Sequence, residues 1–391
     1  MRGTIIKNEG KRGVSYTVLV DVGTDMDGNR KQKKKTFKAK KDAENWLSET
    51  INAVNKGTYI EPIKTTLGEY LKKWLDTYGK QNLAISTLES YENIIKKHIV
   101  PELGTIPLQK LLPAHLQDYY SKALGEGRID NKKAMGRALS PTTVLYHHRV
   151  LREALNHALR SGLVSRNVAD AVEPPRKVKH DLRVLPEEDI PTLLDLFKDS
   201  YLYMPVYLAV MTVMRAGEIL ALKWENIDLK EGIINISQSL RQRKAGQPEF
   251  QQPKTAGSRR TVELSPIVTK ALKDYKTAQA KEKLAQGENY AKYNLVCCLS
   301  NGQPIHPGTL ASRFYKITRA ANMTINFHGL RHCHATFLLK AGVSPKIVAE
   351  RLGHSTTRLT LDTYSHVVPG MQKEAALKLE QRLFNSQQSG Q

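Results

Sequence analysis

The feature that most constrains this chain is a short segment that fits neither a helix nor a strand. Residues 173–183 read EPPRKVKHDLR, in which two prolines and five basic side chains occur without apolar periodicity. Proline removes a backbone donor and disfavours helix in the residue before it, so such a segment is typical of a linker. It divides a chain of 391 residues, more than one ordinary core accommodates. We expect a multi-domain protein with an interdomain linker at 174–184.

The residues before position 62 predict a small β-meander followed by a helix. Residues 15–22 (SYTVLVDV) are rich in strand formers, Asp27-Gly28 is a hairpin-turn signal, and residues 36–38 could close a third strand. Apolar side chains then recur at helical spacing over residues 40–56. We assign residues 1–62 to this N-terminal domain.

A run of basic side chains crosses the third predicted strand. Such a run is either a solvated face or a surface that faces phosphates, and the run alone leaves both interpretations open. We retain it as a candidate DNA-binding surface formed by Lys31, Lys33, Lys34, Lys35 and Lys38.

Residues 63–173 predict an all-α domain, because helix-capping signals precede apolar residues at helical spacing and strand signals are scarce. Proline at the first turn and glycine after the last turn mark the ends of such helices. The signals in order are a capping box at Thr66 to Glu69, a second at Ser86 to Glu89 with Pro101 as its stop, a start near Pro113, and Ser140-Pro141 opening a helix that ends at Gly162.

Residues 185–391 predict a mainly α (α+β) domain. Strand signals occur at residues 233–236 and 261–264, and the turn-rich basic stretch between them places Lys254 on or beside a hairpin loop. Near the C-terminus, residues 370–383 predict a helix with one apolar stripe, which could dock on a neighbouring subunit or pack on its own domain. The stripe consists of Met371, Ala375, Leu379 and Leu383.

The charge of the chain indicates a polyanionic partner. Sixty Lys and Arg against 38 Asp and Glu give a formal net charge of +22, which favours nucleic acid through counterion release but does not exclude a membrane surface. No run approaches the roughly 20 apolar residues that a membrane span needs, so we expect a cytoplasmic protein. Three cysteines, Cys297, Cys298 and Cys333, form no disulfide framework, and we expect reduced thiols.

Arg215 lies in an unusual position for an arginine. It follows an apolar run, residues 204–214, and precedes Ala216 to Leu222, which indicates a partly buried side chain. A buried guanidinium group is rarely unpaired. Arg215 therefore either forms a structural ion pair with Glu218 one turn later or reserves its fork for a phosphate, and this segment does not decide between the two.

A second cluster occurs at residues 328–332, which read HGLRH. His328 and Arg331 lie three residues apart at the start of a predicted helix, where they can share a face and where backbone donors favour an anion. A zinc site is the alternative, built from His328 and His332 with Cys333 or His334. No carboxylate or cysteine completes it at a characteristic zinc spacing, so we expect no metal.

The last candidates are His354 and Tyr364. Gly353 ends a predicted helix, His354 follows it, and Tyr364 comes ten residues later. Tyr364 alone would be read as an ordinary core or surface aromatic. The ordered set Arg, Lys, His-x-x-Arg, Gly-His and Tyr, however, contains the groups that phosphoryl transfer through a phenolate needs.

This set resembles the signature of the tyrosine recombinases, and more closely that of the integrases of temperate phages and conjugative transposons. The resemblance rests on residues 328–332, on Leu-Gly-His at 352–354 and on Tyr364. It implies a β-sheet domain for arm-type DNA, a helical core-binding (SAM-like) domain and a catalytic domain. One departure is that the family often has Gly-Leu before the first arginine, where this chain has Val213-Met214.

The resemblance also implies a role for each matching residue. Tyr364 attacks the phosphodiester and leaves a 3′-phosphotyrosyl bond with a free 5′-hydroxyl, and no metal or cofactor takes part. Two arginine forks neutralise the charge of the transition state. The implied roles are Arg215 and Arg331 as these forks, His328 as acceptor of the Tyr364 proton, Lys254 as general acid, His354 as donor to a non-bridging oxygen, and Glu218 as support of Arg215.

Two other functions compete with integration of a phage or mobile element. A type IB topoisomerase has a similar set of residues, but the arm-type domain and the spacing from His354 to Tyr364 favour recombination. A non-catalytic DNA-binding regulator is the second alternative. The integrase hypothesis implies double-stranded core and arm DNA as substrates, a homo-tetramer on DNA, an excisionase and a host DNA-bending protein as partners, and action at the bacterial nucleoid.

Overall fold

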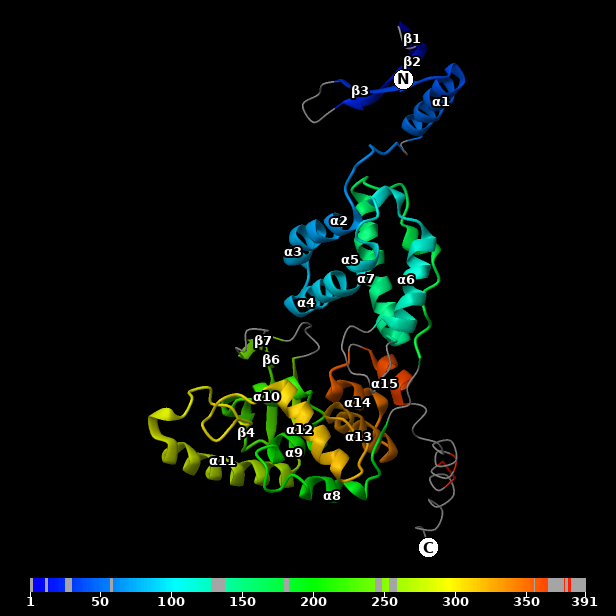
Figure 1. The fold of residues 1–391 in the computed structure, drawn as a ribbon. Helices are drawn as coiled ribbons and strands as arrows, with labels where there is room; N and C mark the ends of the chain where they lie inside the picture. Colours follow the sequence, from blue (N-terminus) through cyan, green and yellow to red (C-terminus); the bar gives the residue numbers. More distant parts are fainter. Residues whose placement is uncertain are drawn as a thin grey trace. The chain divides into compact units, whose positions relative to one another are not determined.

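The structure is a computed structural model of the chain. It describes residues 3–10, 13–24, 30–56, 59–127, 138–178, 183–242, 248–252, 259–354, 356–364, 376 and 379–380. Contacts between residues divide the chain into two compact units, Met1–Lys179 and His180–Gln391. Each unit is described by itself below, with the elements as labelled in Figure 1.

The N-terminal part of the first unit is an antiparallel sheet of three strands in the order β1-β2-β3, covered by helix α1. Val18 and Val20 of β2 are fully buried beside Ala43 of α1, because alternate residues of a strand face the same side. The expected meander and helix are confirmed, while Asp27-Gly28 lies outside the described residues. The bounds are β1 Gly3–Gly10, β2 Gly13–Thr24, β3 Arg30–Phe37 and α1 Lys40–Asn55.

The remainder of this unit is helical, as expected. The Thr66 hydroxyl accepts a hydrogen bond from Glu69 N and the Glu69 carboxylate accepts one from Thr66 N, which completes the predicted capping box. The hydroxyl of Ser140 likewise accepts a bond from Thr143 N. The helices are α2 Leu67–Trp74, α3 Lys80–Asn82, α4 Ile85–Ile94, α5 Val100–Leu103, α6 Pro113–Glu126 and α7 Pro141–Arg160.

Two details of the second predicted helix are wrong. Ser86 does not cap it, since α4 begins one residue earlier with Ala84 as its N-cap. Pro101 does not stop it either, because a π-helical turn at Ile95–Ile99 shifts the hydrogen-bond register and places Pro101 in the first turn of α5. Proline is tolerated there because its missing N–H has no helical acceptor to lose.

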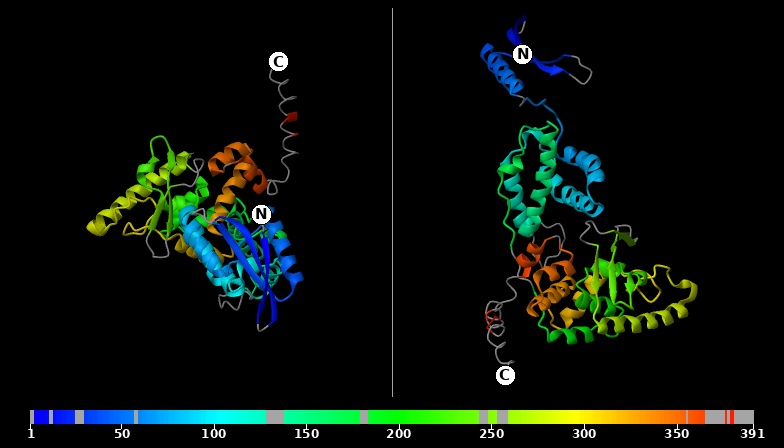
Figure 2. Two further views of the ribbon diagram at one scale, coloured as in Figure 1. Left: turned by 90° about the horizontal axis from the view of Figure 1, so that it is seen from above. Right: turned by 180° about the vertical axis from the view of Figure 1, so that it is seen from behind.

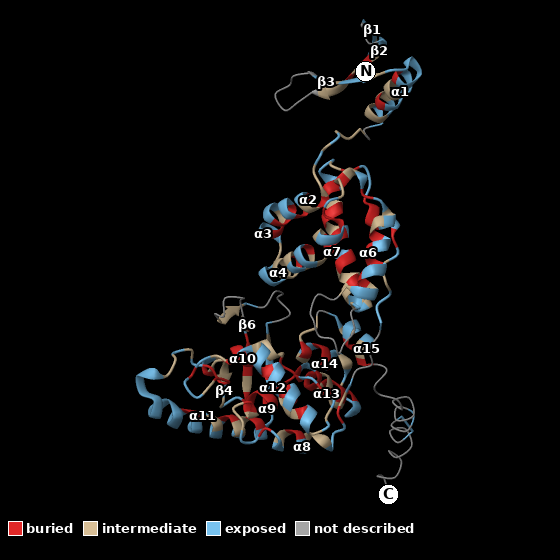
Figure 3. Ribbon diagram, in the orientation of Figure 1, coloured by how far each residue is buried: buried red, intermediate tan, exposed pale blue. Residues whose placement is uncertain are grey.

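The second unit is mainly helical around two small antiparallel sheets, β4-β5-β8 and β6-β7. Figure 3 shows that α9 is buried, and α9 packs against α13. In Figure 1 and Figure 2 the orange helices α13 to α15 lie together, away from the yellow end of α11. The helices are α8 Asp189–Asp195, α9 Tyr203–Thr212, α10 Ala216–Ala221, α11 Pro266–Gln286, α12 Pro307–Ala320, α13 Phe327–Lys340, α14 Pro345–Leu352 and α15 Thr357–Tyr364.

Strands β5 and β8 of this unit match the two sequence signals at 233–236 and 261–264, while β4, β6 and β7 were not predicted. They are β4 Ile227–Asp228, β5 Ile233–Ile236, β6 Ser239–Gln242, β7 Pro248–Gln251 and β8 Arg260–Glu263. The apolar stripe expected at residues 370–383 falls almost entirely outside the described residues. The three cysteines, all described, are buried free thiols. In the described part of the chain, no helix combines the length and apolar character that crossing a membrane requires.

Candidate active site

The turn before Arg215 brings its side chain to the edge of the core. Helix α9 ends at Thr212, and Val213 then takes a left-handed conformation with φ 54° and ψ 12°. This conformation is uncommon for a β-branched residue, but the Val213 side chain is fully buried. Arg215 is thereby the N-cap residue of α10, with its side chain 39% exposed.

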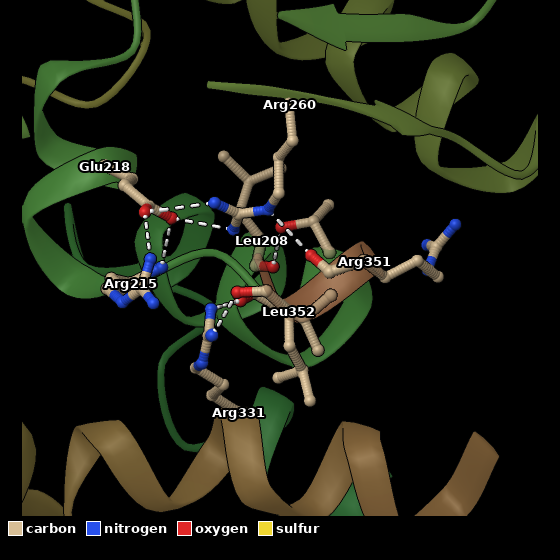
Figure 4. A network of polar contacts seen from close by, with 9 residues as sticks. Leu208, Arg215, Glu218, Arg260, Arg331, Arg351 and Leu352 are labelled. Atoms are coloured by element: carbon tan, nitrogen blue, oxygen red, sulfur yellow. Dashed lines mark hydrogen bonds and ion pairs between the residues drawn. The ribbon is translucent and has the colours of Figure 1, made fainter. Parts of the chain in front are cut away.

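Glu218, one turn into α10, binds Arg215, which is one of the two interpretations that the sequence left open. Its carboxylate accepts Arg215 N at 2.8 Å and Arg215 Nη1 at 2.8 Å. The same carboxylate also accepts both terminal nitrogens of Arg260, at 3.1 and 2.9 Å (Figure 4). Burial acts to raise the pKa of Glu218, but the hydrogen bond and charge of Arg260, followed by those of Arg215, hold it below its usual value.

Arg331 connects the two chain segments that flank the site. Arg331 lies on α13 and is 3% exposed. Its Nη1 donates to the Val213 carbonyl and its Nη2 to the Leu352 carbonyl (Figure 4). Burial lowers the pKa of Arg331 to about 9, helped by the charges of Arg215 and Arg260. The guanidinium group stays charged at neutral pH.

Tyr364 closes the site from the end of α15. Tyr364 is 1% exposed and belongs to a buried cluster with Val213 and Leu352. The Tyr364 hydroxyl lies 2.8 Å from Nδ1 of His332. Burial raises the pKa of Tyr364 to about 12, while the charge of Arg331 acts in the opposite direction. The phenol is therefore fully protonated at neutral pH until something removes its proton.

His332 and His328 stand on successive turns of α13. Their rings meet edge to face with centroids 4.9 Å apart, and His332 is the one that contacts Tyr364. Burial lowers the pKa of His332 to about 4, with further lowering by His328 and Arg331. Burial and Arg331 also lower the pKa of His328. Both rings are neutral at pH 7, and neutral imidazole can accept a proton.

His354 lies just beyond the end of α14. Gly353 adopts the left-handed conformation, φ 63° and ψ 43°, which ends the helix as predicted. Nδ1 of His354 is 2.8 Å from the Thr360 hydroxyl of α15. Burial lowers the pKa of His354 to about 4, with Arg331, Arg215 and Arg260 contributing, so His354 belongs to the same electrostatic neighbourhood.

Lys254 falls outside the described residues, so its position relative to the other predicted site residues is not described. The chain is described again from residue 259, and β8 begins at Arg260, six residues after Lys254.

Four of the five lysines predicted to bind DNA lie on strand β3, on both faces of the N-terminal sheet, and Lys38 follows that strand. Lys31 and Lys33 each form an ion pair with Glu61, which follows α1. Lys35 places its Nζ 5.0 Å from the centre of the Phe37 ring. Lys34 and Lys38 are exposed, Lys34 on the strand face opposite to Lys33 and Lys35.

Two residues of the site have functional contacts that the sequence did not assign. Arg260 is part of an unremarkable basic stretch, and only the fold brings it to Glu218. His332 was weighed as a zinc ligand, but among the described residues no three histidine, cysteine or acidic side chains gather as metal ligands would. The proximity of His332 to Tyr364 had no signal beyond its position in the HGLRH motif.

The cluster is suited to phosphate chemistry. Two guanidinium groups, those of Arg215 and Arg260, bind the Glu218 carboxylate, and a third, that of Arg331, lies in the same electrostatic neighbourhood. The buried phenol of Tyr364 on α15 contacts the neutral imidazole of His332 on α13. Charged donors fixed in a partly buried site stabilise a phosphoryl transition state without reorganising.

Three family models match successive segments of the chain. Residues 183–370 match the phage integrase family, residues 66–124 its N-terminal SAM-like domain, and residues 5–54 an arm DNA-binding domain. A tyrosine recombinase XerC-like protein of Caldanaerobacter subterraneus subsp. tengcongensis is 28% identical over 388 residues, which cover 94% of this chain and 96% of that protein.

Two solved structures share the fold. The Tn1549 transposon integrase in complex with a circular intermediate DNA superposes with a TM-score of 0.64 at 17% identity, over 81% of this chain and 99% of that one. Lambda integrase, as a tetramer bound to a Holliday junction, gives a TM-score of 0.53 at 19% identity, over 90% and 96%. With three family domains matched in order, the chain belongs to the phage integrase family and is a tyrosine recombinase, an enzyme that cleaves and rejoins DNA.

Proposed function

We propose that this recombinase cuts and rejoins DNA through Tyr364 at a centre formed by Arg215, Arg331, His354 and the histidines of α13. The observation that carries the proposal is the placement of the Tyr364 phenol against a neutral imidazole beside the buried Arg331. Tyr364 Oη bonds to the scissile phosphorus, its proton passes to a histidine, and the bond from phosphorus to the 5′-oxygen breaks. The product is a 3′-phosphotyrosyl bond.

The guanidinium groups of Arg215 and Arg331 neutralise the non-bridging oxygens, and His354 donates to one of them. Lys254 gives a proton to the departing 5′-oxygen. Attack by the 5′-hydroxyl of a partner strand reverses these steps and completes strand exchange without ATP. Since His332 contacts Tyr364, His332 rather than His328 is the better-placed proton acceptor, and His328 then faces the phosphate beside Arg331.

The substrates in this proposal are duplex attachment sites of a phage or other mobile element. The family domains support a division of labour in which residues 1–62 bind arm sites, residues 63–173 bind core sites, residues 174–184 are the linker and residues 185–391 hold the chemistry. Lambda integrase has been solved as a tetramer on a Holliday junction, and we infer a homo-tetramer here. An excisionase and a host DNA-bending protein would set direction at the bacterial nucleoid.

The proposal is tested with a nicked suicide duplex that carries the core site, because loss of the short fragment that bears the freed 5′-hydroxyl prevents religation and traps the covalent complex. The wild type should yield a phosphotyrosyl adduct that survives denaturation. Tyr364→Phe should bind the duplex and yield none. Tyr315→Phe, at an exposed tyrosine of α12, is the matched control and should trap normally.

An adduct formed by Tyr364→Phe would refute the role of Tyr364. Relaxation of supercoiled DNA without dependence on an attachment site would favour the topoisomerase alternative over integration.

A further inference from the structure

Arg260 occupies an unusual place for a residue next to a DNA-cleaving centre. It is the first residue of β8, and its side chain is 6% exposed. Nε donates to the Arg351 carbonyl at 2.7 Å, while Nη1 and Nη2 donate to the two oxygens of Glu218 (Figure 4). One planar fork thus connects β8 with α10 and with the last turn of α14.

The effect of Arg260 on Glu218 decides how Glu218 holds Arg215. A buried carboxylate facing Arg215 alone would be matched by a bidentate pair, which would use both terminal nitrogens of Arg215. With Arg260 on the same two oxygens, Arg215 contributes its backbone N and Nη1. The rest of the Arg215 fork belongs to a side chain that is 39% exposed.

The contact with the Arg351 carbonyl extends the same effect to α14. Arg351 is adjacent to Leu352, whose carbonyl accepts Arg331, and His354 follows two residues later. Arg260 and Arg331 therefore hold consecutive carbonyls at the end of this helix. A buried ion pair is by itself weak evidence of a stabilising role, because desolvation of the charges offsets much of their attraction. Here two arginines share Glu218, and one of them also binds α14.

We propose that Arg260 is a positioning residue of the cleavage reaction, which acts through Glu218 to aim Arg215 at the scissile phosphate and through Arg351 to fix the approach of His354. The inference rests on the proposed function, since it needs Arg215 to bind that phosphate. Arg260 itself contacts no substrate in this scheme. Arg260 is not part of the signature set, which consists of Arg215, Lys254, His328, Arg331, His354 and Tyr364.

The first test compares Arg260→Met, which removes the fork, with Arg260→Lys, which keeps the charge. Arg259→Met is the matched control, because Arg259 is the exposed neighbour on the same segment. Cleavage of the suicide duplex is measured under single turnover at saturating protein, alongside DNA affinity and thermal unfolding. We expect Arg260→Met to cleave about 100-fold more slowly and Arg260→Lys about 10-fold, on the scale of losing one aligned donor, with affinity and the control within about threefold.

A pH profile separates positioning from simple stabilisation. Glu218 is faced by Arg215 from the start of α10, by Arg260 from β8, and by Arg331 and His328 from α13. Without Arg260, burial acts less opposed and raises the pKa of Glu218. Cleavage by Arg260→Met should then fall as the pH drops and Glu218 gains a proton. Adding Glu218→Gln should abolish that pH step without restoring the rate.

The outcomes distinguish the two levels of the argument. If the wild type traps no adduct, the proposed function fails. The positioning role is refuted if the wild type traps DNA while Arg260→Lys, folded with an unchanged melting temperature, cleaves at the wild-type rate. This result would stand even if Arg260→Met did not fold. A rate loss in Arg260→Met without any new pH step that depends on Glu218 would also overturn it.

Discussion

His332→Gln tests which histidine takes the proton from Tyr364. Burial raises the pKa of Tyr364 to about 12. The pKa of Tyr364 is therefore about five units above pH 7, and ionising the phenol before attack would cost about 7 kcal/mol at about 1.36 kcal/mol per unit. A base that takes the proton during attack avoids most of that cost. His332, at 2.8 Å from the hydroxyl, is placed to do so.

Glutamine keeps a hydrogen-bond acceptor beside Tyr364 but cannot take up a proton. General-base catalysis contributes about 10²- to 10⁴-fold, so we expect His332→Gln to slow single-turnover cleavage by at least about 100-fold. The loss of stability should stay near 1 kcal/mol, as for a single hydrogen bond. His328→Gln is the matched comparison, one turn away on the same helix.

The pH dependence of cleavage is a second test of His332 as the proton acceptor. The pKa of His332 is lowered to about 4, by burial first and then by its cationic neighbours, so the ring is neutral and able to accept above that pH. A bound phosphate offsets the charge of Arg331, which raises the pKa of His332 above its value in the free enzyme. Cleavage should fall as the pH drops through the pKa of His332, and His332→Gln should lack that acidic limb. Wild-type rates in His332→Gln beside a 100-fold loss in His328→Gln would refute this assignment and support His328.

Two further predictions concern the backbone and the N-terminal sheet. Val213→Gly should destabilise the protein about as much as Val213→Ala in thermal unfolding. Glycine relieves the left-handed φ by about 1–2 kcal/mol, but it costs about 0.5–1 kcal/mol in backbone entropy and about 0.8 kcal/mol for the lost carbon. A glycine variant less stable than the alanine variant by about 2 kcal/mol would contradict the left-handed conformation of Val213. Glu61→Gln should free Lys31 and Lys33 and tighten arm-site binding about threefold at low salt, with weaker binding in a duplex titration as the contrary result.

Local signals in the sequence predicted most of the secondary structure. The capping boxes and glycine stops act over a few residues, so Thr66, Ser140 and Gly353 appear where the pattern placed them. Pro101 was misread because a π-helical turn, which leaves no pattern in the side chains, resets the register before it. Ser86 failed for a related reason, since a helix can begin without a side-chain cap.

The site was only partly predictable. Glu218 lies three residues from Arg215, within the reach of a helical pair, so the contact between them follows from spacing. Arg260 lies 42 residues from Glu218 and 91 from Arg351, and only the packing of β8 against α14 brings them together. The pairing of His332 with Tyr364 likewise depends on how α15 folds back after Gly353, which a motif read along the chain does not contain.

The guanidinium groups of Arg215, Arg260 and Arg331 have a consequence for the life cycle of the folded protein. In the described part of the chain, the Glu218 carboxylate binds Arg215 and Arg260, while Arg331 binds two backbone carbonyls, so the site holds like charges together before any DNA arrives. That arrangement lowers the stability of the free enzyme, and under the proposed function a bound phosphodiester would offset this loss by linkage. Selection for robustness alone would replace one of the arginines, whereas selection for recombination retains the strain. We therefore expect the enzyme to resist unfolding most while it holds DNA, and to become more susceptible to proteolysis once the exchanged strands are released.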